Sequence, residues 1–540
     1  MKKLFGSLWL VLCLALLSCV FSPRVCQAAG VTVITHGFES SASFPNWVSA
    51  MADKIPSVQQ FSGTNFTTYR ITLTYNSPNY FYSVTRTNGS APFATDSGEI
   101  IVELDWSVIS ADVFHSYGST LGVATVVNWV LTQTNIIPEL EGHALAEFPL
   151  HLVGHSRGAS LMAETSRQLG TNGIWVDQLT TLDPHPLNND SHSDFPASVV
   201  DAPAKFTYAN VLFADNYWQN LGAGYLFGDP DGEPVSGAYQ RQLFNLSGGY
   251  NNDHSNVHLW YHGTVDLATP ASDGSGGATI TTAQRTSWWQ TNEADGALTG
   301  FYYSLIDGGD RLSTAQPLGF GTSEIRDGFN QAWSLGAGTS SNRTALTSNN
   351  GSWPNLIRFN RINTNAVVQG QNASVTYYYQ WASSTTNLAT VSIYLDNDRN
   401  PLNTNQTLLK QINVPANGAS FVSLQTLSIP FDATNASPGL HTLFAKITGG
   451  GQTRYLYAPE SVQVLPGAQP PILAVLRPNG SQIQIVVNGL VGQKIILQST
   501  TDLMNWVPVS TNTLTASPWI FPDSFSNANG RRFYRAALTN

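Results

Sequence analysis

Residues 152–160 read LVGHSRGAS. The apolar run before them predicts a strand, and the stretch ASLMAETSRQL that begins at residue 159 predicts a helix. Ser156 stands at their junction, with Gly154 and Gly158 two residues to either side. This pattern is typical of a strained strand–turn–helix that lifts a serine hydroxyl off a sheet, and the glycines leave room for neighbouring backbone. The amide of Arg157 would then lie at the positive end of the helix, where a developing oxyanion is stabilised.

The region around this motif alternates short apolar runs with helical ones, from Gly30 to about residue 265. VTVITH (31–36) and EIIVELDW (99–106) read as strands, and NWVSAMADKI (46–55) and GVATVVNWVLTQT (122–134) read as helices. Such alternation predicts a largely parallel sheet with helices on both faces. Residues 265–350 are rich in Gly, Ser and Thr, and we take them as an extension, so that the first domain spans 30–350.

The rest of the chain reads as all-β. From residue 356 onward, short runs of β-formers are separated by turn residues, which predicts an antiparallel sandwich over 356–466. The Pro-rich stretch LPGAQPP (465–471) reads as a stiff linker, and residues 472–540 as a smaller all-β module. A multidomain chain is what a length of 540 residues leads us to expect.

The first 29 residues predict a cleaved export signal. MKK gives a positive start, LFGSLWLVLCLALLSCVF an apolar core, and VCQAAG a small-residue exit suited to cleavage after Ala28 or Ala29. All three cysteines lie inside this segment, so disulfides and cysteine metal sites are not expected in the mature chain. We therefore expect a secreted protein; LLSC, ending at Cys19, offers a lipid anchor as the less favoured alternative. The net charge of −10 argues against a nucleic-acid partner.

An elbow serine needs a base and an acid that orients it. QLTTLDP (178–184) places Asp183 just after a predicted strand, and NVLFADN (210–216) places Asp215 at the end of the next one. Both acids could reach the base, because the carboxyl ends of neighbouring parallel strands share one rim of the sheet. We favour Asp183, because the DPHP turn fixes it immediately outside the sheet.

The base is expected in NNDHSNVHLWYHGT (251–264). His258 and His262 read as packing residues in VHLWYH, a predicted strand. His254 precedes that strand in a polar loop, where a catalytic histidine would be mobile and near the surface, so we predict His254 as the base.

The second oxyanion donor is expected in ITHGFES (34–40). Gly37 would let the backbone approach the substrate, and the amide of Phe38 would then join that of Arg157.

Together, ITHGF, ELDW, GHSRGA and TLDPHP resemble the lipase branch of the α/β-hydrolase superfamily, and pancreatic-type lipases in particular, over roughly residues 31–265. The resemblance implies an α/β-hydrolase fold followed by the two all-β sandwich modules, and it supports Asp183 over Asp215 as the acid. It also implies a triad of Ser156, Asp183 and His254. Arg157 departs from the family, which carries an apolar residue there, and no disulfides frame the loops.

These features predict a secreted serine hydrolase that cleaves carboxylic esters, a lipase or esterase that needs no cofactor. One alternative is a polyester or polysaccharide-ester hydrolase whose β-modules hold it on a polymer or cell surface. Another is an inactive surface-binding protein, which the survival of every catalytic element in order disfavours. Oligomeric state is left open.

The predicted sandwiches resemble immunoglobulin-like and small terminal modules of exported bacterial proteins. YLDNDRNP (394–401) clusters Asp396, Asp398 and Asn400 in one loop, which makes them a weak calcium candidate.

Overall fold

The fold is taken from a computed structural model of the chain. The structure describes residues 30–58, 66–91, 99–190, 198–221, 230–267, 272–292, 295–307, 343–346, 353–362, 366–382, 388–398, 400–416, 425–467, 470–479, 482–524 and 531–539. The predicted signal segment 1–29, with Cys13, Cys19 and Cys26, lies outside these ranges.

An eight-stranded sheet organises the first part of the chain, in the order β3-β2-β4-β1-β5-β6-β7-β8. Its strands are β1 (Val31–Thr35), β2 (Phe66–Asn76), β3 (Asn79–Gly89), β4 (Glu99–Asp105), β5 (Leu150–His155), β6 (Val176–Leu182), β7 (Val211–Gln219) and β8 (Tyr239–Leu243). The pairs from β2 to β8 are parallel, whereas β3 joins β2 as an antiparallel hairpin, so the sheet is mixed.

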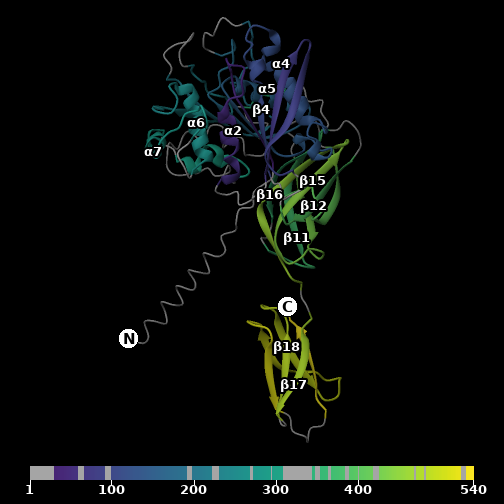
Figure 1. The fold of residues 1–540 in the computed structure, drawn as a ribbon. Coiled ribbons are helices and arrows are strands. Elements are labelled where there is room, and N and C mark those ends of the chain that lie inside the picture. Colours follow the sequence, from purple (N-terminus) through teal and green to yellow (C-terminus); the bar gives the residue numbers. More distant parts are fainter. Residues whose placement is uncertain are drawn as a thin grey trace, which may run out of the picture. The chain divides into compact units, whose positions relative to one another are not determined.

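Helices pack on both faces of this sheet because successive strand residues point to opposite sides. The α-helices are α2 (Asn46–Ala52), α3 (Ser107–Ser110), α4 (Thr120–Thr132), α5 (Arg157–Thr171), α6 (Asp253–Val265) and α7 (Thr282–Thr291). In β1, Val33 packs in one apolar cluster with α4 and α5, and Ile34 packs in another with α2 and α6. The ribbons of these four helices are labelled in Figure 1. No helix in the described ranges is both long and apolar enough to cross a membrane.

Helix α6 corrects one sequence expectation. Residues 257–262 were predicted to be a strand, but they lie inside a helix that Asn252 caps by accepting a hydrogen bond from the Ser255 amide. Nearly the whole helix is buried, so its sequence lacks the polar face that would have given the helical period. The same error placed His254 in a mobile loop; it lies in the first turn of α6 and is only 9% exposed.

The later part of the chain consists of short strands. They are β9 (Asn355–Ile362), β10 (Ala366–Val368), β11 (Asn372–Gln380), β12 (Leu388–Asp396), β13 (Thr407–Pro415), β14 (Gln425–Asp432), β15 (Gly439–Gly449), β16 (Gln452–Leu465), β17 (Ile472–Asn479), β18 (Gln482–Asn488), β19 (Lys494–Thr500), β20 (Val507–Thr513), β21 (Trp519–Ser524) and β22 (Phe533–Leu538). They form one five-stranded sheet, β10-β16-β15-β12-β13, and three of three strands: β14-β11-β9, β17-β18-β21 and β20-β19-β22.

The chain divides into two compact units. The first takes residues up to 365 with 373–431 and 440–462, and it holds the eight-stranded sheet and most of β11 to β16. The second takes 366–372, 432–439 and 463–540, where Ile485, Val487, Ile495 and Leu497 form a small core of their own. The predicted domain ranges stay predictions.

The predicted fold class, an α/β-hydrolase followed by two all-β sandwich modules, is wrong for this chain. Only 20% of the structure is helical and 42% is strand, the antiparallel β3 makes the large sheet mixed, and several small sheets follow it. The β3 strand carries polar and exposed side chains, so no apolar run predicted the β2–β3 hairpin.

Candidate active site

Ser156 lies at the turn between a strand of the large sheet and the helix that follows it. The predicted flanking elements are confirmed as β5 and α5, and the serine between them has φ 58° and ψ −126°. A non-glycine residue in such a conformation is strained and persists only where its surroundings fix it. Its amide donates to the carbonyl of Leu182 at 2.9 Å, which holds the serine beside the end of β6.

Three glycines make room for this turn. A Cβ on Gly154 would come within 2.1 Å of the Gly158 carbonyl oxygen, and one on Gly158 would come within 2.4 Å of the His36 carbonyl oxygen. A Cβ on Gly37 would lie 2.5 Å from the Cβ of Ser156 and 2.9 Å from its Oγ. Gly37 therefore lies directly against the serine, and its predicted approach to a substrate stays a prediction.

Asp183 follows β6 and is completely buried, with φ 46°. Its Oδ2 lies 2.6 Å from Nδ1 of His254 and accepts from Nε2 of Gln219 at 2.9 Å; its Oδ1 accepts from the Gln219 amide at 2.8 Å. Burial raises the pKa of Asp183, and the two hydrogen bonds from Gln219 oppose that rise. The structure thus brings together the acid and the base that the sequence proposed.

Gln219 was not recognised from the sequence. It ends β7, and its side chain also donates to the Pro230 carbonyl and accepts from the Leu221 amide. A signal was present, because β7 neighbours the strand that delivers Asp183, and its last residue reaches the same rim.

His254 is held from its other side by the motif itself. Nε2 of His155 lies 3.0 Å from the His254 backbone oxygen, and the two rings lie 4.5 Å apart. Burial lowers the pKa of His254, and the neighbouring His185 and His258 lower it further. The imidazole is therefore neutral near pH 7, which is the form that can accept a proton.

Asp215 does not share this site. It lies in the middle of β7, which continues to Gln219, and not at a strand end as predicted. Its Oδ1 accepts from Oγ1 of Thr180 at 2.6 Å and from Nε2 of Gln178 at 3.1 Å, and its Oδ2 accepts from the Tyr217 hydroxyl at 3.0 Å. The structure assigns this carboxylate to the hydrogen bonding of the sheet.

The two predicted oxyanion donors flank Ser156. Arg157 is the first residue of α5, and Phe38 follows Gly37 with a side chain that is 42% exposed. Trp106 holds the turn that carries Gly37 and Phe38, because its Nε1 donates to the His36 carbonyl at 2.9 Å. The roles of both amides stay predictions.

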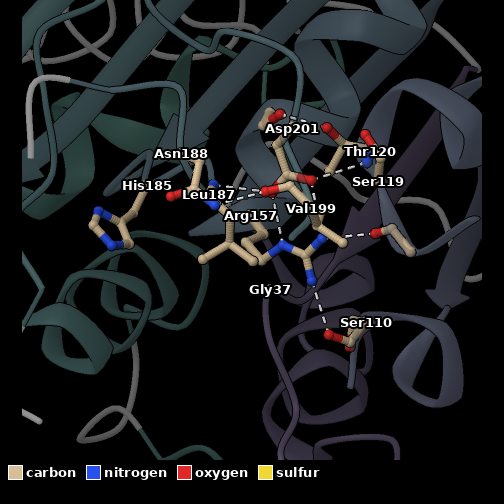
Figure 2. Close-up of polar contacts among 12 residues, drawn as sticks. Gly37, Ser110, Ser119, Thr120, Arg157, His185, Leu187, Asn188, Val199 and Asp201 are labelled. Atoms are coloured by element: carbon tan, nitrogen blue, oxygen red, sulfur yellow. Dashed lines mark hydrogen bonds and ion pairs between the residues drawn. The ribbon is translucent and has the colours of Figure 1, made fainter. Parts of the chain in front are cut away.

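Arg157 stands where the lipases that the sequence resembles carry an apolar residue, and the contacts of its side chain give it a structural role. It is 1% exposed, and Nε and Nη2 bind the two oxygens of Asp201 at 2.7 and 2.9 Å. Nη1 also donates to the Ser110 carbonyl (Figure 2). Nη2 donates to the Gly118 carbonyl as well. One guanidinium thus ties the start of α5 to three other segments, and the distant Asp201 gave no local sign of the pair.

Asp201 in turn orders the loop after the acid. Its oxygens accept from the amides of Leu187 and Thr120, both at 3.0 Å, as Figure 2 shows. The carboxylate therefore receives four N–H donors, which is the satisfaction that a buried charge requires.

A second acid–histidine cluster lies deeper in the same fold. Asp273 is buried, with Oδ2 2.9 Å from Nδ1 of His258 and Oδ1 2.8 Å from Nδ1 of His262. The two histidines hold the pKa of Asp273 below its ordinary value. His258 stacks on Trp47 with 4.3 Å between ring centroids, which agrees with the packing role predicted for it.

The two carboxylates of the calcium candidate accept hydrogen bonds from neighbouring residues. Asp396 accepts from the Tyr457 hydroxyl at 2.6 Å and from the Asp398 amide, and Asp398 accepts from the Asn400 amide and the Asn403 side chain. Among the described residues, no group of three or more His, Cys, Asp or Glu side chains is arranged to hold a metal ion.

Comparison with known proteins adds little. No family model and no curated protein matches the chain. A β-glucosidase from Listeria innocua in complex with isofagomine is 17% identical with a TM-score of 0.16, and the match spans 22% of this chain and 16% of that one. The human OSCAR ligand-binding domain is 15% identical with a TM-score of 0.16, over 35% of this chain and 88% of that one. Scores this low carry no argument, and these neighbours do not show an α/β-hydrolase.

Proposed function

We propose that the protein is a serine hydrolase that cleaves carboxylic esters through an acyl-enzyme. The observation that carries this proposal is the 2.6 Å contact between Asp183 and His254 at the rim where the strained Ser156 is held. Burial of both partners and the fixed turn give a preorganised site rather than a chance contact.

The acid and the base divide the proton chemistry between them. Nδ1–H of His254 donates to Asp183, which leaves Nε2 as the nitrogen that takes the proton of the Ser156 hydroxyl. The serine oxygen attacks the ester carbonyl, and the proton on Nε2 then passes to the leaving alkoxide. Water attacks the acyl-enzyme by the same route, which releases the acid and restores the serine.

The oxyanion of each tetrahedral intermediate is bound by the amides of Phe38 and Arg157. Gly37 lets the first amide approach, because any larger residue would meet the serine side chain. The Arg157 amide lies at the start of α5, where the helix dipole adds to its donor strength.

The proposal includes export of the protein, because residues 1–29 carry a positive start, an apolar core and a small-residue exit. The exposed rings of Phe81, Tyr82 and Trp129, on β3 and α4, line an apolar groove with Tyr80 and Val126. Such a groove is consistent with the lipase or polymer-ester alternatives, and substrate length separates them.

The test is hydrolysis of p-nitrophenyl esters from acetate to palmitate by residues 30–540. We expect turnover that disappears in Ser156→Ala, and the chain-length profile distinguishes a lipase from a short-chain esterase. Ser160→Ala is the matched control, since Ser160 is a buried serine of the same helix that bonds to Thr120 and the Ala202 carbonyl instead. Full activity in Ser156→Ala, or none in the unmutated protein on any ester, would contradict the proposal.

A further inference from the structure

The amino-terminal edge of the sheet holds a buried carboxylate that the proposed chemistry does not use. Glu99 begins β4 and is 2% exposed. Its Oε2 accepts from the backbone nitrogen of Gly30 at 2.8 Å, and its Oε1 accepts from Oγ1 of Thr32 at 2.7 Å. In the described part of the chain, both donors to this carboxylate are uncharged.

A second buried acid at this edge already has a cation. Asp177, on β6, interacts with the guanidinium of Arg454, which donates to the carbonyl oxygens of Ala146 and Trp175. Among the described residues Glu99 has no cationic partner, and burial together with Asp177 raises its pKa to about 8 despite its two hydrogen bonds. A carboxylate removed from water without a cation is costly, so this edge lacks one positive charge.

We propose that the chain is cut between Ala29 and Gly30, and that the new α-ammonium group of Gly30 forms a buried ion pair with Glu99. The cut is a hydrolysis: one water is consumed, a carboxylate is left on Ala29, and an amino group on Gly30 takes up a proton. The co-reactant is an endopeptidase that cleaves exported chains after small residues. This processing depends on the export predicted from residues 1–29 and not on the ester chemistry.

The position of the cut follows from the geometry at Gly30. Its nitrogen already lies at ion-pair distance from Glu99, so a chain that begins there places the charge without rearrangement. A chain that begins at Ala29 keeps an uncharged amide at this point and carries its ammonium one residue away. Glycine also fits best, because a Cβ here would lie 3.0 Å from the Pro149 carbonyl oxygen.

The first experiment identifies the natural end of the chain. The full chain is expressed in a bacterium that exports it, and the purified product is analysed by intact mass and amino-terminal sequencing. We expect Gly30 as the first residue. A product that begins at Ala29, that begins at a lipid-bearing Cys19, or that keeps residues 1–29 would overturn the proposal.

The second experiment tests the ion pair. Chains that begin at Gly30 and at Ala29 are released from a removable tag with free amino termini, each with and without Glu99→Gln. The Gly30 chain should melt about 2 °C or more above the Ala29 chain, and Glu99→Gln should abolish that difference. Glu141→Gln is the control, because Glu141 is exposed, and the difference should survive it. Equal melting temperatures for the two chains, or a difference that persists in Glu99→Gln, would contradict the pairing.

Discussion

Asp183, just after β6, and Asp215, inside the neighbouring β7, are two completely buried aspartates with different surroundings. Asp183 lies one residue beyond β6, in a left-handed conformation, and offers an oxygen to His254. Asp215 lies inside β7, and its oxygens accept from side chains of β6 and from Tyr217. Position relative to the strand end, rather than burial, separates an orienting acid from a structural one.

The largest effect is expected at Asp183. In Asp183→Asn, kcat should fall by about 10⁴-fold, because an amide no longer selects the Nδ1–H tautomer of His254. Ester kinetics and the melting temperature are measured together, and folding should be retained. If Asp215→Asn lost more activity than Asp183→Asn, the comparison between the two acids would be inverted.

Arg157 binds Asp201, which holds the loop after Asp183, and a substitution at Arg157 tests this contact. Arg157→Met should lower the free energy of unfolding by about 3–5 kcal/mol, because it leaves Asp201 charged and buried. The control is Arg86→Met, which removes a pair with Glu139 whose side chains are 39% and 37% exposed, and it should cost under about 1 kcal/mol. Urea unfolding measures both, and equal losses would mean that the buried pair has no special weight.

A substitution at Gly37 tests the close contact between this turn and Ser156. Gly37→Ala should reduce kcat about 100-fold, because the added Cβ displaces the serine or the oxyanion turn. Phe38→Ala keeps the backbone amide and should stay within a few-fold of the unmutated protein on acetate esters. Similar activity in Gly37→Ala would show that the turn does not press on the serine.

Asp215→Asn should act on stability instead. We expect a loss of about 1–3 kcal/mol in the free energy of unfolding, because the hydrogen bonds from Thr180, Gln178 and Tyr217 are weakened. The kcat of the folded fraction should change by no more than a few-fold. A large loss of kcat with unchanged stability would return Asp215 to the active site.

The smallest expected effect is in the pH profile. Below its pKa, His254 is protonated and cannot accept the serine proton, so kcat/KM should fall on the acid side. Because burial lowers that pKa, the midpoint should lie below the ordinary histidine value of about 6.5. A midpoint above 6.5 would indicate that Asp183 stabilises the charged imidazole more than burial disfavours it.

The predictable part of the site lay where chemistry depends on local sequence. Gly154 and Gly158 must each lie two residues from Ser156 because one turn needs all three, and the turn at Gly37 follows the first strand directly. Asp183 was separable from Asp215 by its position in the DPHP turn and by the family resemblance. These residues were found because their spacing is itself the physical requirement.

The parts that sequence reasoning missed depend on long-range packing. Arg157 and Asp201 pair across 44 residues with no local pattern to predict the pair. Gln219 meets Asp183 across 36 residues, and only the neighbouring positions of β6 and β7 could have suggested it. Helix α6 is buried nearly all round and so lacked an amphipathic period. The predicted fold class missed the antiparallel β3, because its polar and exposed side chains form no apolar run.

Covalent labelling of the resting protein with a fluorophosphonate, followed by peptide mass spectrometry, tests directly whether His254 and Asp183 activate Ser156. An activated serine should form one phosphonyl adduct, on Ser156, and Asp183→Asn should slow its formation at least about 100-fold while Asp215→Asn leaves the rate nearly unchanged. An unlabelled Ser156, or the same labelling rate in both aspartate variants, would contradict a serine activated by His254 and Asp183.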